Sequence, residues 1–171
     1  LHYEGIDTVE QMANRDIFNL EKLPKRLTVI GAGPIGVEMA QAFARFGSKV
    51  SMIALDNQVL PREDAEAAQV VNQALKDDGI ELFLGAQITK FVAGESSKQI
   101  HFELNGQSHV VDADEILLAT GRAPNIDELD LAKAGISFDK AGVKVNDKLR
   151  TSNPRVYAAG DVIGDFQFTH A

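Results

Sequence analysis

Three glycines in the first quarter of the chain, Gly31, Gly33 and Gly36, have the spacing at which a strand turns sharply into a helix. In such a turn Gly31 permits the tight reversal, Gly33 leaves space where a pyrophosphate would approach, and Gly36 lets helix and strand pack closely. Pro34 suits the first helical position, where an N–H group would have no partner within the helix. The unpaired N–H groups of that first turn, together with the helix dipole, favour a phosphate. The stretch Gly31-Ala32-Gly33-Pro34-Ile35-Gly36 therefore predicts a dinucleotide phosphate site.

The segments on either side of this turn predict a strand, a helix and a second strand. Residues 27–30 are short, apolar and largely β-branched, and residues 49–53 form the second strand at the spacing that a βαβ unit requires. A glycine turn of the same composition that binds no ligand is the alternative, and the flanking strands and helix weigh against it. Between the strands, four apolar residues recur at helical spacing and are expected to face one core: Ile35, Met39, Phe43 and Phe46.

A second helix and a third strand extend the same pattern. Glu63 and Asp64 place carboxylates at the start of a helix that runs to about Asp78, and residues 80–84 read as a strand. The order βαβαβ is half of a doubly wound parallel sheet. Five residues of this helix make the stripe that is expected to be buried: Ala67, Val70, Val71, Ala74 and Leu75.

The pattern then changes to short strands. Residues 87–92, 99–104 and 107–112 predict an antiparallel meander in place of a crossover helix, and Asn105-Gly106 is a strong hairpin signal. Residues 115–119 predict a further buried strand. Beyond the Thr120-Gly121-Arg122-Ala123-Pro124-Asn125 loop we expect a weak helix and two short strands, at residues 127–134, 143–145 and 156–159.

Composition limits the classes of function. The net charge is −8 and no cluster of Lys and Arg offsets it, so nucleic acid is not an expected partner. No apolar run approaches the ~20 residues of a membrane span, and no signal-peptide pattern opens the chain, so a cytoplasmic protein is expected. The 171 residues include no cysteine, and the four histidines lack metal-ligand spacing, so no metal site or redox dithiol is predicted. Because the first residue is Leu1, we interpret the chain as a piece of a longer protein.

Four motifs occur together and in order: the glycine turn continued through Glu38, the Leu-Pro-Arg-Glu-Asp break at 60–64, the Ala-Thr-Gly-Arg-Ala-Pro-Asn loop at 119–125, and Thr151 followed by Val-Tyr-Ala-Ala-Gly-Asp at 156–161. This series resembles the class I pyridine nucleotide-disulfide oxidoreductases, the family of dihydrolipoamide dehydrogenase, mercuric reductase and glutathione reductase. The resemblance covers nearly the whole chain and leaves the substrate open.

The resemblance implies an α/β, Rossmann-like FAD/NAD(P)-binding fold, in which a parallel sheet carries helices and an antiparallel three-stranded meander. It also implies a division of the chain. Residues 1–22 would be the linker leaving the FAD domain, 23–121 the NAD(P)-binding domain, and 122–171 the return into the FAD-binding domain. The parent protein would contain FAD and be a homodimer.

By the same resemblance, Glu38 would lie beside nicotinamide and flavin, paired with a lysine outside this chain; a solvated helix carboxylate is the alternative. Asp161 would hold the ribityl chain of FAD, with Gly160 allowing close approach; an ordinary Gly-Asp turn is the alternative. The cofactor contacts implied in full are Gly31, Gly33, Pro34, Ile35, Gly36, Ala54, Leu55, Gly121, Gly160 and Asp161.

The residues expected to read the adenosine ribose give a weak cofactor preference. Ala54 stands where an NAD-specific member offers an acid, and Leu55 where an NADP-specific member offers an arginine. Asp56 would repel a 2'-phosphate, and Arg62 is the first cation after it. We therefore expect NAD(H) to be preferred weakly over NADP(H).

The resemblance implies that hydride passes between nicotinamide and flavin, and that electrons then pass to or from a cysteine pair. That pair is absent from this chain, so the chain alone is expected to be inactive. Two alternatives stay open. One is a flavoprotein without a redox disulfide, such as an NAD(P)H oxidase, transhydrogenase or ferredoxin reductase. The other is a non-enzymatic NAD(H) sensor, against which the flavin-type motif ending at Asp161 argues.

Overall fold

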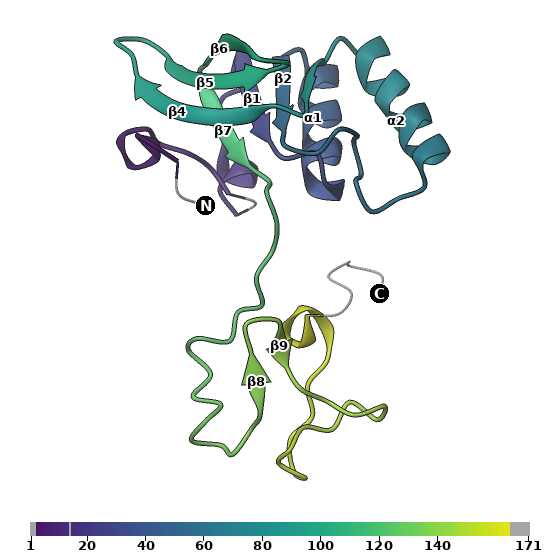
Figure 1. The fold of residues 1–171 in the computed structure, drawn as a ribbon. Coiled ribbons are helices and arrows are strands. Elements are labelled where there is room, and N and C mark those ends of the chain that lie inside the picture. The colour runs from purple at the N-terminus through teal and green to yellow at the C-terminus, as the bar shows by residue number, and fades with distance from the viewer. Residues whose placement is uncertain (1–2, 14, 165–171) are drawn as a thin grey trace. The chain divides into compact units, whose positions relative to one another are not determined.

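The computed structural model describes residues 3–13 and 15–164. The chain divides into two compact units, Leu1–Thr120 (unit 1) and Gly121–Ala171 (unit 2). Each unit is described by itself (Figure 1).

Unit 1 contains a parallel sheet of four strands in the order β3-β2-β1-β7 and an antiparallel sheet in the order β4-β5-β6. Its order is the half of a doubly wound fold that the sequence predicts. The elements of unit 1 are η1 (Ile6–Thr8), η2 (Ile17–Asn19), β1 (Arg26–Ile30), α1 (Pro34–Phe46), β2 (Lys49–Ala54), α2 (Ala65–Asp77), β3 (Glu81–Leu84), β4 (Gln87–Ala93), β5 (Lys98–Leu104), β6 (Gln107–Ala113) and β7 (Glu115–Leu118).

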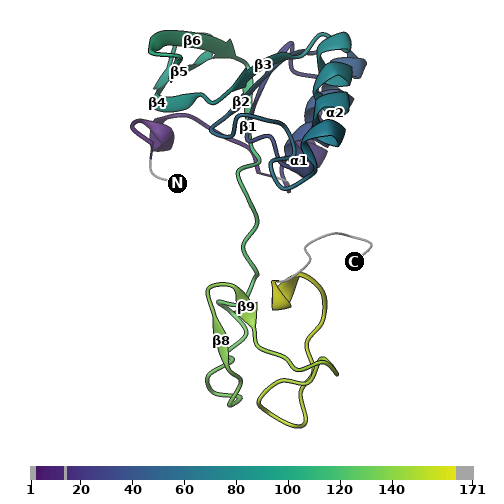
Figure 2. The ribbon, with the colours of Figure 1, turned by 45° about the vertical axis from the view of Figure 1, so that its right-hand side comes forward.

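The parallel sheet is the middle of three layers. Both α1 and α2 cover one face and the meander covers the other, as the two views of the ribbon show (Figure 1 and Figure 2). Successive side chains along each strand point to opposite faces of the sheet. Each strand therefore contributes to two hydrophobic cores, one on each face. Met52 packs toward the helices, whereas its neighbour Ile53 packs toward the meander, against residues such as Phe102. The parallel strands are therefore apolar on both faces.

Both small and large residues of the helices face the sheet. In α1 the buried residues are Gly36 and Ala40, and Phe46, expected to be buried, is 68% exposed. In α2 the buried residues are Ala68 and Leu75. Part of each predicted stripe is confirmed, because Leu75 is buried and Met39, Phe43 and Val71 pack against the same core. For α2, Ala67 and Val70 were predicted to be buried and are exposed.

The meander follows the predicted strands to within one residue at each end. Asn105 and Gly106 both have positive φ, 53° and 75°, which is the conformation that a two-residue type I′ hairpin requires. The strand pairing shifts between Ile88 and Lys90, where a β-bulge or irregularity interrupts β4.

The N-terminal segment packs on unit 1. It contains the two short 3₁₀ turns η1 and η2. Between them, Met12 forms a parallel bridge beside Leu117 at the open edge of β7. The Met12 N–H donates to the Ile116 carbonyl at 2.8 Å, and the Leu118 N–H donates to the Met12 carbonyl at 2.8 Å. The edge of β7 is thus partly covered.

Unit 2 has little regular structure among its described residues. It contains β8 (Phe138–Asp139) and β9 (Gly142–Val143), paired as a hairpin, and η3 (Gly160–Ile163), around a small core. Residues 127–134 form turns, so the predicted helix there is wrong. Residues 156–159 form no strand and contribute only the bridge between Tyr157 and Arg150, and the strand expected at 143–145 ends at Val143. Two-residue strands are too short to leave a periodic signal in a sequence.

Candidate cofactor-binding site

The glycine turn lies at the carboxyl ends of β1, β2 and β7. Gly31 has φ +108°, a conformation that residues with side chains rarely adopt, and its N–H donates to the Ile53 carbonyl at 2.8 Å. A Cβ added there would lie 2.5 Å from the Ala119 carbonyl oxygen. The reversal after β1 therefore requires glycine both for its conformation and for its fit against the end of β7.

Gly33 differs from Gly31 because its surroundings are open. Its φ and ψ of −72° and 179° suit any residue, and a Cβ added there would meet no atom within 4 Å. Gly33 caps α1, and its carbonyl accepts the Val37 N–H at 3.0 Å. Pro34 has no N–H, and helix geometry leaves the N–H groups of Ile35 and Gly36 without an intrahelical acceptor. The start of α1 thus combines unused donors with free space, which suits an anionic group.

Gly36 closes the other side of the turn. A Cβ there would clash with the Gly31 carbonyl and would lie 3.4 Å from the Ala119 Cβ. Ala119 was not singled out as a site residue by the sequence. Its role follows from the parallel pairing of β7 with β1, which brings the ends of both strands to the same edge of the sheet.

The loop after β2 is fixed to its neighbours by backbone hydrogen bonds. The Ala86 N–H donates to the Ala54 carbonyl and the Gly85 N–H to the Asp56 carbonyl, both at 2.9 Å. Further along, the Leu60 N–H donates to the carbonyl of Ala32, within the glycine turn, at 2.7 Å. Ala54, the last residue of β2, is buried, and Leu55, the first residue of the loop, is 75% exposed.

The other charged candidates in unit 1 are on its surface. Glu38 lies in the second turn of α1 and is exposed, as is Arg62 in the loop before α2. The neighbours of Glu38 on either side, Val37 and Met39, pack against the core. An exposed Glu38 is compatible both with a role at a bound nicotinamide and with a solvated carboxylate.

Three candidate residues belong to unit 2: Gly121, Gly160 and Asp161. Gly160 starts η3 with φ 75°, and Asp161 follows it in the first turn. The Arg122 guanidinium forms an ion pair with the Asp161 carboxylate. The sequence gives Arg122 only as part of a loop motif, and local spacing contains no signal for a contact between residues so far apart.

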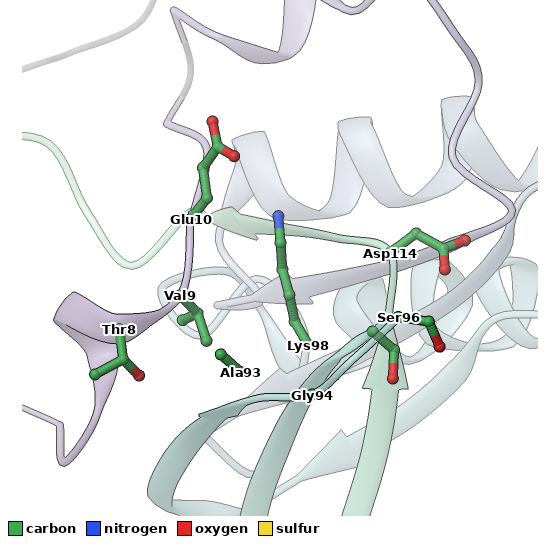
Figure 3. A pocket seen from close by; sticks show the side chains of 9 residues that line it. Thr8, Val9, Glu10, Ala93, Gly94, Ser96, Lys98 and Asp114 are labelled. Atoms are coloured by element: carbon green, nitrogen blue, oxygen red, sulfur yellow. The ribbon is translucent and has the colours of Figure 1, made fainter.

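A separate cavity of about 250 Å³ lies between the turn that joins β4 to β5 and the segment after η1 (Figure 3). It is near the amino ends of β1 and β7, at the opposite edge of the sheet from the glycine turn. Asp114, which lines it, accepts hydrogen bonds from the Arg26 side chain, and these hold the pKa of Asp114 below its usual range. Lys98, in the same wall, pairs with Glu115 at 2.6 Å. Asp114 and Lys98 thus each form an ion pair within the protein, and we assign no ligand to the cavity.

Residues 3–13 and 15–164 bring together no group of three or more metal-ligating His, Cys, Asp or Glu side chains. Within the same ranges neither helix, each of 13 residues, has the length and apolar character needed to cross a bilayer.

Comparison with known proteins identifies close relatives. The sequence profile described as pyridine nucleotide-disulphide oxidoreductase matches residues 2–171. Mercuric reductase of Bacillus cereus is 36% identical over 97% of this chain and 26% of its own length. Dihydrolipoyl dehydrogenase of Bacillus subtilis (strain 168) is 34% identical over 92% of this chain and 34% of its own length.

Solved structures of flavoproteins and related oxidases share the fold of this chain. The HOCl-induced flavoprotein disulfide reductase RclA of Escherichia coli has a TM-score of 0.88 at 32% identity, over 99% of this chain and 39% of its own. The water-forming NADH oxidase of Lactobacillus brevis, bound to NADH, has a TM-score of 0.76 at 30% identity, over 95% and 36%. An engineered NADPH oxidase derived from it and bound to NADPH has a TM-score of 0.77 at 29% identity, over 95% and 36%. The chain thus spans 26–39% of the length of these proteins.

Proposed function

Because the chain belongs to the pyridine nucleotide-disulphide oxidoreductase family, we propose that it is the NAD(P)(H)-binding part of an FAD-dependent oxidoreductase. In the whole protein, hydride would pass between nicotinamide and flavin, and electrons would pass to or from a disulfide. The observation that carries this proposal is the glycine turn, which is closed to a side chain at Gly31 and Gly36 and open at Gly33. A turn needed only for packing has no reason to leave space at its middle glycine.

Each candidate residue has a part in this proposal. The N–H groups of Ile35 and Gly36 would bind the pyrophosphate, helped by the dipole of α1, and Pro34 would fix the start of that helix. Glu38 would lie at the nicotinamide end, and Ala54 and Leu55 at the adenosine ribose. Gly121 would let the chain pass close to the cofactors. When bound, nicotinamide and flavin supply the redox chemistry itself.

The division of the chain follows from the same proposal. Residues 1–22 would link to an FAD domain, 23–121 would bind the nicotinamide cofactor, and 122–171 would return to the FAD domain, with Gly160 and Asp161 at the flavin. The break between compact units after Thr120 supports the second boundary. The parent is proposed to be a cytoplasmic homodimer.

The proposal includes a weak preference for NAD(H) over NADP(H). The NADPH-bound oxidase differs from its parent by five substitutions: a glycine to alanine, then aspartate, alanine and methionine in succession to alanine, arginine and serine, and a proline to arginine. Counted from Gly36 at the same intervals, the five corresponding positions of this chain are Gly36, Ala54, Leu55, Asp56 and Pro61. The aspartate that would favour NAD is already replaced by Ala54. Both introduced arginines are missing, however, and Asp56 would repel a 2'-phosphate.

A second candidate function differs from the first in its electron acceptor. The water-forming NADH oxidase shares this fold at 30% identity, so a flavoprotein without a redox disulfide is the alternative. The two differ in whether the FAD domain carries a cysteine pair, and this chain holds no cysteine.

Anaerobic stopped-flow reduction of the full-length flavoprotein by NADH tests the proposal. We expect bleaching of the flavin band, and slower bleaching in the Gly33→Val variant at the same subsaturating NADH concentration. Titration of the reduced enzyme with a disulfide substrate and with oxygen then separates the two acceptors. A flavin band that NADH and NADPH both leave unchanged would reject the proposed function.

A further inference from the structure

Leu60, in the loop between β2 and α2, has a backbone conformation that its side chain disfavours. Its φ is 49°, in the left-handed region that bulky residues rarely enter. The next residue is Pro61, and a residue that precedes proline is further restricted in its backbone angles. Such strain persists only where the surrounding structure imposes it, and it is concentrated at functional sites. The contacts of Leu60 must therefore hold it in this conformation.

Hydrogen bonds hold the backbone of Leu60 on both sides. Its N–H donates to the Ala32 carbonyl at 2.7 Å, and its carbonyl accepts the Glu63 N–H at 2.9 Å, which closes a turn with Pro61 at its second position. The preceding residue, Val59, is fully buried in the core between the sheet and the helices, whereas the side chain of Leu60 is only half-buried. The hydrogen bond to the glycine turn is thus made by the backbone of Leu60 and needs no particular side chain.

The hydrogen bond to Ala32 fixes the plane of the peptide group that joins Ala32 to Gly33. This peptide bond is trans, so its carbonyl oxygen and its N–H group point in opposite directions. Because the carbonyl is turned toward Leu60, the Gly33 N–H is turned away from the loop. Within residues 3–13 and 15–164 no group accepts a hydrogen bond from this N–H, and a side chain added at Gly33 would meet no atom within 4 Å. An unused donor thus lies beside the open space at the start of α1.

We propose that Leu60 is a positioning residue for the dinucleotide pyrophosphate: its N–H binds the Ala32 carbonyl and so directs the Gly33 N–H to a pyrophosphate oxygen. This inference rests on the proposed function, since it assumes that the glycine turn binds NAD(H). A donor that is held in place before binding needs no ordering when the anion arrives, and this favours affinity. The two hydrogen bonds of the Leu60 backbone and the burial of Val59 offset the strain at Leu60.

The test separates backbone conformation from side-chain packing by comparing Leu60→Gly, Leu60→Asn and Leu60→Ile in this chain. Glycine and asparagine enter the left-handed region readily, whereas β-branched isoleucine, an isomer of leucine, does not. Leu149→Ile is the matched control, because Leu149 also has a positive φ, 57°, and belongs to unit 2. NADH affinity is measured by titration calorimetry below the thermal midpoint of each variant, and the Gly33 amide resonance is followed by ¹⁵N NMR.

We expect Leu60→Ile to weaken NADH binding about tenfold, as the loss of a hydrogen bond to a charged group would, although this variant changes the side chain least. Leu60→Gly and Leu60→Asn should bind NADH like the wild type, because both keep the backbone conformation. The Gly33 amide resonance of the free chain should move in Leu60→Ile and much less in the other two variants. Leu149→Ile should bind NADH like the wild type.

The opposite order of affinities would overturn the inference. If Leu60→Gly and Leu60→Asn lose affinity while Leu60→Ile keeps it, the side chain of Leu60 matters and its backbone does not. If the three variants bind NADH equally, or if Leu60→Ile lowers only the thermal midpoint, Leu60 has no positioning role, and the glycine turn as the binding site stands. A wild-type chain that binds no NADH would instead reject the proposed function.

Discussion

At the scale of single residues, the three glycines of the turn differ in what a side chain would meet, and this gives a paired prediction. Gly33→Val should keep the fold and weaken NADH binding by about 2 kcal/mol, roughly thirtyfold, because the added side chain fills open space at the start of α1. Gly36→Val should instead destabilise unit 1 by about 2 to 3 kcal/mol, since it would push α1 away from Gly31 and Ala119. Calorimetric titration and thermal melts of both variants check this, and similar behaviour of the two would refute the assigned roles.

Glu38 gives a second prediction, made for the full-length flavoprotein. If the carboxylate faces the nicotinamide, Glu38→Ala should slow flavin reduction at least about tenfold, which is about 1.4 kcal/mol, while changing NADH affinity much less. Glu66→Ala on α2 is the control, an exposed glutamate elsewhere on the surface of unit 1. Stopped-flow traces decide the matter, and an unchanged reduction rate would favour the solvated carboxylate.

Some residues of the site could be predicted from the sequence and others could not. Gly31, Gly33 and Gly36 are recognisable because the turn imposes its demands within six consecutive residues. The pair of Arg122 and Asp161 is not, because its members are brought together by folding of unit 2, and neither residue type is unusual in its own surroundings.

At the scale of elements, strands were predicted more accurately than helix faces. The strands of unit 1 have clear ends, set by alternation and by turn residues such as Asn105-Gly106. The helix faces were predicted in part, since Met39, Phe43 and Leu75 pack in the core as expected. Phe46 and Val70 are exposed instead, and the small residues Ala40 and Ala68 are buried. Unit 2 could not be predicted in detail, since its strands have two residues each.

The junction between β1 and the end of the meander supplies a pH prediction. Arg26 donates to Asp114 from its side chain and its backbone N–H, and these bonds lower the pKa of Asp114 in the folded state. Asp114 therefore contributes stability that is present above its unfolded pKa, about 3.9, and is lost as the pH falls through the lower folded value. Denaturant unfolding between about pH 5 and pH 2 should show a shallower loss of stability in Asp114→Asn than in the wild type. Identical slopes would mean that this ion pair is not formed.

At the scale of the whole molecule, the chain holds one side of a proposed flavin site. Unit 2 supplies Gly160 and Asp161, and the other contacts of so large a ligand would come from the FAD domain. Too few contacts remain to offset the cost of immobilising FAD, so the purified chain should be colourless. An absorption spectrum checks this, and a stoichiometric flavin band would contradict the proposed division of the chain.

The central claim is that unit 1 binds a dinucleotide at the glycine turn, and amide chemical-shift mapping of the ¹⁵N-labelled chain during titration with NADH tests it most directly. We predict one-to-one binding, with the largest shifts at residues 31–37 and 54–56. NADPH should produce the same pattern with affinity weaker by about 1 kcal/mol, roughly tenfold or less. The account would be contradicted if NADH shifted no resonances, or shifted only residues 93–98 and their neighbours around the cavity of Figure 3.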